Sequence, residues 1–247
     1  MLMRILFFLV LSVCLQPSLA QNVIIPGDKS LQQSFIKPQR YEMDWYMLRD
    51  TSKIPIGSVL TEIKKSDKEL LLITQVNMNR TNASWIDSSI ASLPGLAPVY
   101  HSSYNMQRDM VLRFGKIVTG YYYDKLKKTM TELSDTTTGY YFDSNLYPYL
   151  LSLVPMKEGF TAEFPIFDHN PAGKKGIIRA YIRSVSAGEY LTKRSGVRKV
   201  WKVMVQDELG SDQQGSSTYY FDQQDRRLWK QEIQAGGRMM LMLARED

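Results

Sequence analysis

The sequence is poor in the residues that build metal centres and disulfide frameworks. Its 247 residues include one cysteine, Cys14, and two histidines, His101 and His169. Cys14 lies inside an N-terminal apolar run, so the remaining chain can form no internal disulfide and offers no thiol ligand. A zinc site needs three or four convergent ligands, which two separated histidines cannot supply. We therefore expect no zinc site and no cofactor; a calcium site built from carboxylates alone is left open, although the sequence has no Asp-x-Asp-x-Asp-Gly loop.

Catalytic signatures are also missing. The sequence has no Gly-x-Ser-x-Gly, no His-Glu-x-x-His, no phosphate-binding loop and no dinucleotide fingerprint. His101 lies in a predicted strand with Ser103 on the same face, which favours a place in a polar network over catalysis. His169 follows a strand end and is interpreted as a turn residue. The sequence thus predicts no catalytic residue and a protein that is not an enzyme.

The N-terminus has the order of features that defines a secretory signal peptide. Within Met1–Ala20, Arg4 supplies the positive region, Ile5–Leu15 is apolar, and small residues occupy the positions that signal peptidase reads. Val13, directly before Cys14, is too large for lipoprotein cleavage, so we expect an unacylated product. We predict cleavage at the end of this segment and a periplasmic or secreted protein.

Charge and hydropathy limit the partners. The formal net charge is +6, and falls to about +5 when Arg4 leaves with the signal peptide. This mild excess could favour an anionic membrane surface, but export argues against a nucleic-acid partner. No later segment is long and apolar enough for a transmembrane helix, so we expect no membrane anchor after signal cleavage.

Apolar and polar residues alternate with period two along most of the chain. Ser58–Lys65 and Leu70–Val76 flank the turn former Ser66-Asp67-Lys68, which is a hairpin pattern. About a dozen such short segments, with almost no helix between them, predict antiparallel pairing, because parallel strands need long crossovers. We expect a mainly β fold: a large curved antiparallel sheet or a partly open barrel. The expected division is a signal peptide at 1–20, an irregular segment at 21–40 and one β domain at 41–247.

Two segments interrupt this alternation. Residues 143–154 place Leu146, Leu150 and Leu153 at helical spacing, so we predict one helix there, packed on the sheet. Asp87–Pro98 is rich in serine, proline and glycine, and is predicted to be irregular chain crossing an end of the sheet.

The C-terminal strands are apolar on both faces, whereas a free antiparallel sheet keeps one face polar. One face could line a ligand cavity, although coverage by the helix and loops or barrel closure would explain the pattern equally. Methionine and tyrosine adapt to irregular ligands. The candidate ligand-binding residues are Tyr147, Tyr219, Phe221, Met240 and Met242. The residues interpreted as tight core on the opposite face are Trp201, Val203, Val205, Leu241 and Leu243.

From Met43 onward the chain resembles a family of exported Gram-negative bacterial β proteins of unknown function. The features that carry this resemblance occur in order along the chain: Ile56-Gly57, Asp87-Ser-Ser89, Pro98–Ser103, Gly139–Ser144, Pro155–Phe160, Trp201–Val205 and Tyr219–Arg227. The resemblance implies an architecture similar to the periplasmic lipoprotein-carrier fold, in which a helical lid covers the apolar concave face of a curved sheet. It implies no catalytic residue.

Two functions fit these observations. The first is an exported envelope protein that binds or carries an apolar, lipid-like ligand in the periplasm. The alternative is a structural or assembly protein of the cell envelope that acts through contacts with an envelope protein partner. An enclosed cavity would favour the first, and an exposed apolar patch would favour the second.

Overall fold

The computed structural model describes residues 22–79, 83–171, 173–209 and 215–246. The predicted signal peptide, Met1–Ala20, lies outside the described residues. In the described residues, helical structure is confined to three short pieces, and strands form the rest of the regular structure. The prediction of a mainly β protein with one large antiparallel sheet is confirmed.

Fifteen strands form one open sheet in the order β8-β7-β6-β5-β4-β3-β2-β1-β15-β14-β13-β12-β11-β10-β9. Every neighbouring pair is antiparallel except β9 and β10. The strands are β1 (Gln39–Arg49), β2 (Ser52–Lys65), β3 (Glu69–Met78), β4 (Ser84–Ser92), β5 (Ala97–Tyr104), β6 (Arg108–Arg113), β7 (Ile117–Asp124), β8 (Thr129–Thr136), β9 (Phe142–Asp143), β10 (Ala162–His169), β11 (Lys175–Leu191), β12 (Val197–Asp207), β13 (Gly215–Asp222), β14 (Leu228–Ala235) and β15 (Arg238–Ala244).

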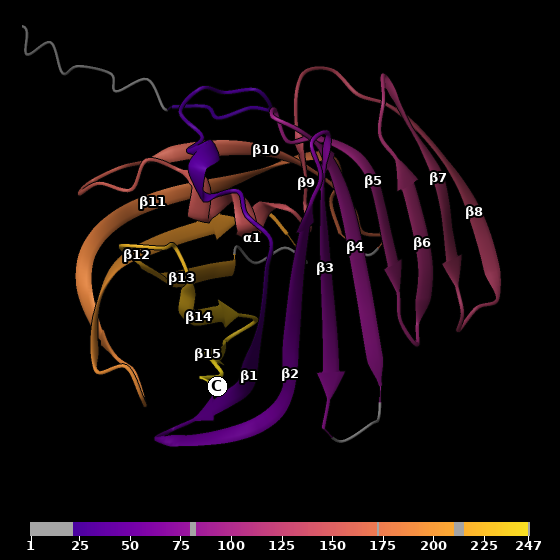
Figure 1. Cartoon of the computed structure of the whole chain (residues 1–247). Helices are drawn as coiled ribbons and strands as arrows, with labels where there is room; N and C mark the ends of the chain where they lie inside the picture. Colours follow the sequence, from indigo (N-terminus) through magenta and orange to yellow (C-terminus); the bar gives the residue numbers. More distant parts are fainter. Residues whose placement is uncertain (1–21, 80–82, 172, 210–214, 247) are drawn as a thin grey trace, which may run out of the picture.

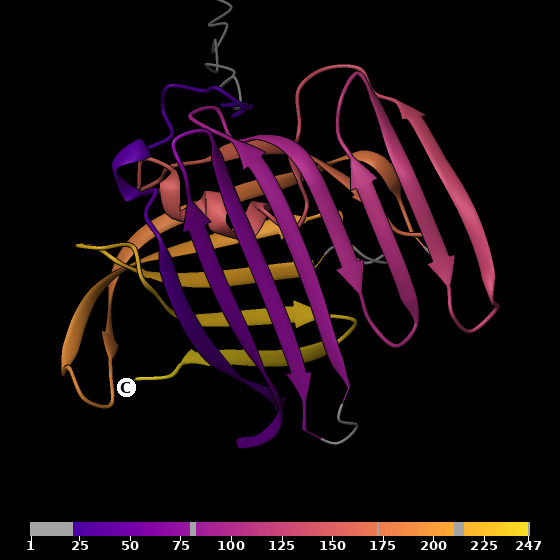
Figure 2. The same ribbon diagram turned by 45° about the vertical axis from the view of Figure 1, so that its right-hand side comes forward.

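The first and last strands are neighbours, and the sheet bends so that its two halves face each other. We call β1–β8 the N-terminal wall and β10–β15 the C-terminal wall. Figure 1 shows the two walls side by side with α1 (Tyr147–Leu150) between them, and Figure 2 shows strands of the C-terminal wall running behind and across those of the N-terminal wall. The inner faces of both walls therefore turn toward one interior.

The predicted hairpin is present. Lys65 pairs with Leu70 across the β2–β3 turn, and the Ser66 hydroxyl accepts the Glu69 backbone N–H at 3.0 Å. On β2, Val59 and Ile63 turn inward and are buried, as the alternation predicted.

The helix is present but shorter than predicted. α1 covers four residues and continues as the 3-10 turn η2 (Leu151–Leu153). Leu146, Leu150 and Leu153 are completely buried, which confirms the apolar stripe. Asp143 is not helical: it ends β9, pairs with Phe167 of β10 and places its carboxylate in a buried polar cluster. The predicted helix start was wrong because this tertiary contact favours an extended backbone.

The prediction of irregular chain at Asp87–Pro98 was wrong except at residues 93–96, because Ala97 and Pro98 already belong to β5. Ser84–Ser92 is strand β4, paired with β3 and β5 over its length. Its inner face carries Asp87 and Ser89, which are buried and hydrogen-bonded to other side chains. Polar residues suit this inner face because the interior supplies partners for them.

The main core lies between the walls, around α1 and η2. Phe142 and Phe164 pack there with their ring centroids 6.2 Å apart. The segment before β1 closes one end of this core: Val23 bridges to Glu163 of β10, and Ile24 and Leu31 are buried. It contains the 3-10 turn η1 (Gln33–Phe35).

Candidate functional site: an internal cavity and a buried polar cluster

A cavity of about 180 Å³ lies in the interior, between the two walls and under α1. β1, β2 and β3 line one side, β13, β14 and β15 line the other, and α1 with η2 closes the top. Its apolar lining consists of aromatic, methionine and aliphatic side chains: Tyr41, Met43, Val59, Leu72, Pro148, Tyr149, Tyr219, Phe221, Leu228 and Met242. Its polar lining is Gln39, Thr61, Thr74, Asn145, Ser152, Arg226 and Gln231.

Three of the five predicted ligand-binding residues line this cavity. Tyr219 and Phe221 stack with ring centroids 5.8 Å apart and nearly parallel planes, and Met242 joins them through the shared register of β13, β14 and β15. Met240 faces the same interior but lies further along β15, opposite Met47, outside the cavity lining. Tyr147 is buried in the core, where it packs against Phe164.

The neighbour Tyr149 lines the cavity in place of Tyr147. Burial raises the pKa of Tyr149, so its phenol stays protonated at neutral pH. The sequence alone did not distinguish these two tyrosines, because both belong to the same short helix.

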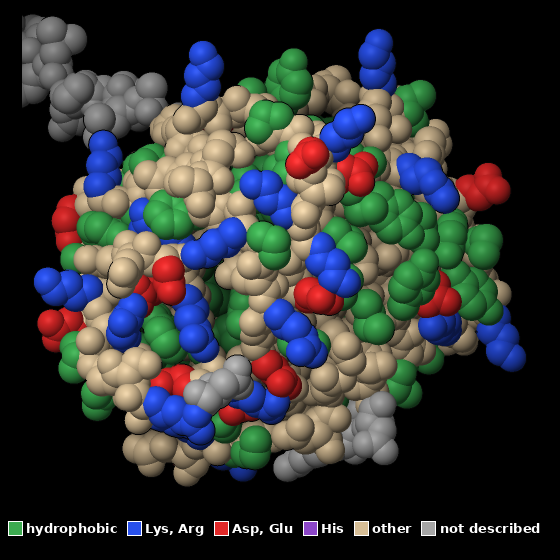
Figure 3. Space-filling view, viewed as in Figure 1, with side chains coloured by type: hydrophobic (Ala, Val, Ile, Leu, Met, Phe, Trp, Pro, Cys, Tyr) green, Lys and Arg blue, Asp and Glu red, His purple; other side chains and the backbone are tan. Residues whose placement is uncertain are grey.

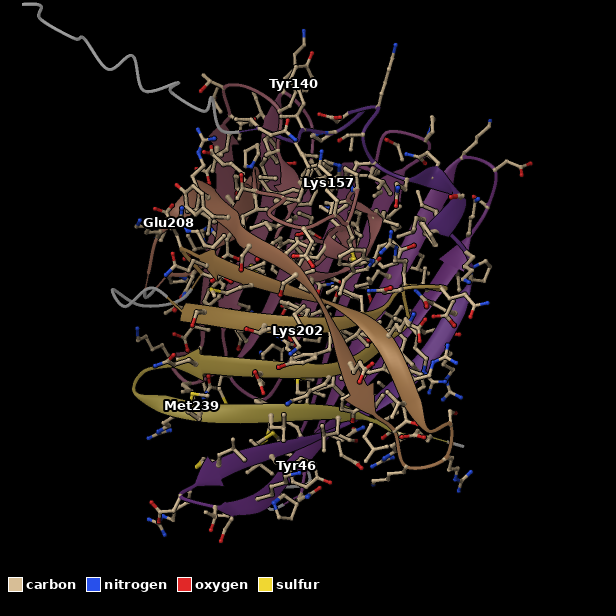
Figure 4. The ribbon with its side chains drawn as sticks, turned by 90° about the vertical axis from the view of Figure 1, so that its left-hand side faces the viewer. Tyr46, Tyr140, Lys157, Lys202, Glu208 and Met239 are labelled. Atoms are coloured by element: carbon tan, nitrogen blue, oxygen red, sulfur yellow. The ribbon has the colours of Figure 1, made fainter. Side chains whose placement is uncertain are left out.

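The predicted grouping of the opposite face was partly wrong. Trp201 pairs with Phe221 and Val203 pairs with Tyr219, so these residues share the inner face. Val205 joins them in the core. Leu241 and Leu243 do face outward, as Met239 does. Figure 4 looks onto this outer side of the C-terminal wall, where the labelled Lys202 and Met239 lie.

Arg226 is the lining residue that sequence reasoning missed. It lies in the turn between β13 and β14 and donates from Nη2 to Gln32 Oε1 at 3.1 Å. Its Nε and Nη1 are buried and have no hydrogen-bond acceptor among the described residues. Its guanidinium lies over the Phe35 ring, 4.8 Å from the centroid. Burial lowers the pKa of Arg226.

The turn that carries Arg226 is fixed by Asp222. This buried carboxylate accepts hydrogen bonds from Arg198 Nε at 2.8 Å, Trp229 Nε1 at 3.0 Å and the Gln224 backbone N–H at 2.8 Å. Burial opposes its charge, but these donors outweigh burial and lower the pKa of Asp222. The Arg226 backbone N–H then closes the turn on the Asp222 carbonyl at 3.2 Å.

A separate buried polar cluster joins β9 to the N-terminal wall. His101 Nδ1 lies 2.9 Å from Asp143 Oδ1, and the Ser89 hydroxyl donates to Asp143 Oδ2. Asn145 Nδ2 donates to the Ser89 hydroxyl oxygen at 2.9 Å. The prediction that His101 belongs to a polar network is confirmed. Burial opposes a charge on His101, but the adjacent Asp143 carboxylate outweighs burial and raises the pKa of His101.

This cluster has the residue types of a hydrolase triad but not its connectivity. A serine nucleophile needs a histidine between itself and the carboxylate, so that the imidazole accepts the hydroxyl proton. Here the Ser89 hydroxyl bonds directly to Asp143, and His101 Nε2 is buried with no partner among the described residues. The arrangement therefore ties strands together rather than activating a nucleophile.

Other features add little chemistry. His169 was predicted to be a turn residue, but it is the buried last residue of β10. It borders a larger hollow of about 590 Å³ beside β7 and β8. Threonines such as Thr129 and Thr131 line much of that hollow. Within the described residues, no group of three or more His, Cys, Asp or Glu side chains is arranged to hold a metal ion.

The described helices are short. In the part of the chain that the structure describes, no helix has the length and apolar character needed to cross a membrane.

Comparison with known proteins identifies the family and the fold. A search of curated proteins gives no match. Among solved structures, a crystal structure of a beta-barrel-like protein of domain of unknown function DUF1849 from Brucella abortus is similar, with a TM-score of 0.53 and 10% sequence identity. The similarity covers 85% of this chain and 97% of that chain, and shows a common fold. The family model described as protein of unknown function (DUF3108) matches residues 40–243. The chain therefore belongs to the DUF3108 family.

Proposed function

We propose that this protein is a non-catalytic, exported envelope protein that binds the apolar part of a lipid-like ligand in its internal cavity. The observation that carries the proposal is the 180 Å³ cavity between the walls, with Tyr219, Phe221 and Met242 in its lining. Export rests on the N-terminal signal sequence.

The lining supports an adaptable apolar site. Methionine and aromatic side chains fit irregular ligands, and they meet here with Tyr41 and Tyr149, which combine an apolar ring with a polar tip. The volume is below the ~300–1,000 Å³ of typical small-molecule pockets. The cavity therefore suits one end of a single acyl chain, while the rest of the ligand extends outside or displaces side chains.

The experiment compares a filled cavity with an equal change on the outer face of the same strand. Met242→Trp places a larger side chain in the cavity, whereas Met239→Trp changes an exposed residue of β15. We expect the mature protein to bind the neutral dye Nile red with increased fluorescence, Met242→Trp to bind it at least about tenfold more weakly, and Met239→Trp to bind like wild type.

Circular dichroism and thermal unfolding establish that both variants fold. If Met242→Trp does not fold, Val59→Ile narrows the opposite side of the cavity with a single added methylene. Absence of Nile red binding to wild type, together with no lipid retained in native mass spectrometry of protein purified from its own envelope, would refute the proposal.

One observation favours the alternative function, assembly through protein contacts. The outer face of the N-terminal wall carries Ile86 on β4, Tyr100 and Tyr104 on β5, and Tyr121 and Tyr123 on β7. Tyr104 and Ile86 are 41% and 38% exposed. Figure 3 shows hydrophobic side chains gathered over β5–β8 on this face. Exposed aromatic patches of this kind mark contact surfaces. Loss of a co-purifying envelope protein on Tyr104→Ser, with Nile red binding retained, would support this role.

A further inference from the structure

The most informative feature that the proposed function leaves unused is the charge of Arg226. Two of its guanidinium nitrogens, Nε and Nη1, are buried without an acceptor in the described part of the protein, and the third donates to a neutral amide, Gln32. The ion pairs formed by described residues include neither Arg226 nor its neighbour on this turn, Arg227. Arg227 donates to the Arg245 carbonyl and leaves one nitrogen, Nε, without an acceptor in the described residues, whereas Arg226 leaves two. Arg226 as a whole is partly buried, and burying part of a cation without an anionic partner is unfavourable unless something else supplies the anion.

The backbone at Arg226 is strained, and this strained conformation helps to hold the side chain in place. Arg226 has φ of 65°, in the left-handed region that favours glycine, and a residue with a side chain there is strained. The Asp222 hydrogen bonds fix the turn, and the Phe35 ring supports one face of the guanidinium. The group is therefore pre-organised at the edge of the cavity, with Nε and Nη1 unused.

The surface beside the cavity is basic. A hollow of about 320 Å³ shares Gln39 and Tyr41 with the cavity lining, so the two adjoin at β1. Its charged lining comprises four cations and two carboxylates: Lys37, Arg40, Arg227, Arg245, Glu42 and Asp225. Arg245 is neutralised by Glu42 and Asp44, which leaves the other cations in excess. An anionic group approaching the cavity would meet a favourable potential.

We propose that the ligand is an amphipathic anion whose headgroup, a carboxylate or a phosphate ester, binds Arg226 while its acyl chain enters the cavity. This inference rests on the proposed function and adds the chemistry of the headgroup. A guanidinium binds planar oxyanions through two parallel N–H donors. In Arg226 each unused nitrogen, Nε or Nη1, can form such a pair with Nη2, which keeps one of its two hydrogens after the bond to Gln32.

The test uses three probes with the same ten-carbon chain: decanoate, decyl phosphate and neutral 1-decanol. Isothermal titration calorimetry at pH 8 measures their affinities for the mature protein. Charge-assisted hydrogen bonds should make at least one anion bind about tenfold or more tightly than 1-decanol. The preferred anion distinguishes a fatty-acid headgroup from a phosphate headgroup.

Three variants assign this preference to Arg226. Arg226→Gln should reduce the affinity for the anion to that for 1-decanol, so that the variant no longer prefers the anion. Arg226→Lys keeps the charge without the planar pair of donors, and should give an intermediate preference. Arg227→Gln, the matched control, removes one positive charge from the same turn and should retain most of the preference.

The outcomes separate the two proposals. If wild type binds all three probes equally, the headgroup assignment is wrong and the cavity function stands. If Arg227→Gln lowers the preference as much as Arg226→Gln does, general surface charge selects the anion, and the assignment to Arg226 is wrong. If no probe binds wild type, the proposed function itself fails. Because Arg226→Gln removes a partly buried cation that has no charged partner among the described residues, we expect its melting temperature to be unchanged or higher.

Discussion

Replacing Asp143 by alanine should destabilise the protein far more than replacing an exposed carboxylate nearby. Asp143 is 1% exposed and accepts hydrogen bonds from Ser89 and His101, so its removal leaves a buried hydroxyl and a buried imidazole without their partner. Breaking a buried pair in this way costs about 3–5 kcal/mol. The contact also connects β9 to β4 and β5, strands that are far from it in the order of the sheet.

Asp109 provides the matched control on the neighbouring strand β6. Its carboxylate forms an ion pair with Lys125 at 2.7 Å, but both side chains are partly exposed. Exposed pairs contribute about 0–1 kcal/mol, so Asp109→Ala should change stability by less than that. Urea unfolding followed by tryptophan fluorescence measures both free energies. If Asp143→Ala costs less than about 1 kcal/mol, the cluster does not hold the two parts of the sheet together.

Three further predictions follow from burial and charge. Leu150→Ala should lower the free energy of unfolding by about 2–5 kcal/mol, because Leu150 is completely buried. Leu126→Ala, at a 76% exposed position, should have almost no effect. If both variants lower the free energy of unfolding equally, α1 lies outside the core. Because the pKa of His101 is raised in the folded state, protonated His101 stabilises the fold below pH 6.5, and this contribution is lost as pH rises through the folded pKa. The free energy of unfolding should therefore fall from pH 6.5 to 9, and His101→Gln should remove that fall. If the variant keeps the same pH dependence, another group is responsible for it. Burial raises the pKa of Asp207 to about 6, so its ionised form destabilises the fold at pH 8, and Asp207→Asn should stabilise it there by about 1–3 kcal/mol; a destabilised variant in thermal unfolding would refute this.

The period-two pattern was sufficient to predict the sheet because inner positions of most strands are apolar. Val59 and Ile63 on β2 are examples: each is buried, whereas Leu60 and Glu62, at the alternate positions, are only partly buried. The pattern fails where the inner face is polar. Asp87 and Ser89 face inward on β4, and their partners, Trp85 and Asp143, are visible only in the folded chain.

The candidate site was predictable to the extent that strand register could be guessed. Tyr219 and Phe221 share a face by simple alternation, and the antiparallel register adds Met242. Alternation alone could not show that Trp201 pairs with Phe221 on that same face. Arg226 was missed for a different reason: a lone arginine in a turn has no periodic signal, and its importance depends on acceptors that the described part of the fold does not provide.

The cavity and the buried polar cluster are physically connected through Asn145. Its side-chain amide donates to Ser89, which bonds to Asp143, and the same residue lines the cavity beside Pro148. The contact that closes β9 onto the N-terminal wall therefore also sets one boundary of the proposed acyl-chain site. Arg226 lies on the other wall, in the β13–β14 turn. A ligand that fills the cavity and binds Arg226 would contact both walls, and would stabilise the same closed arrangement of the sheet that Asp143 holds from the interior.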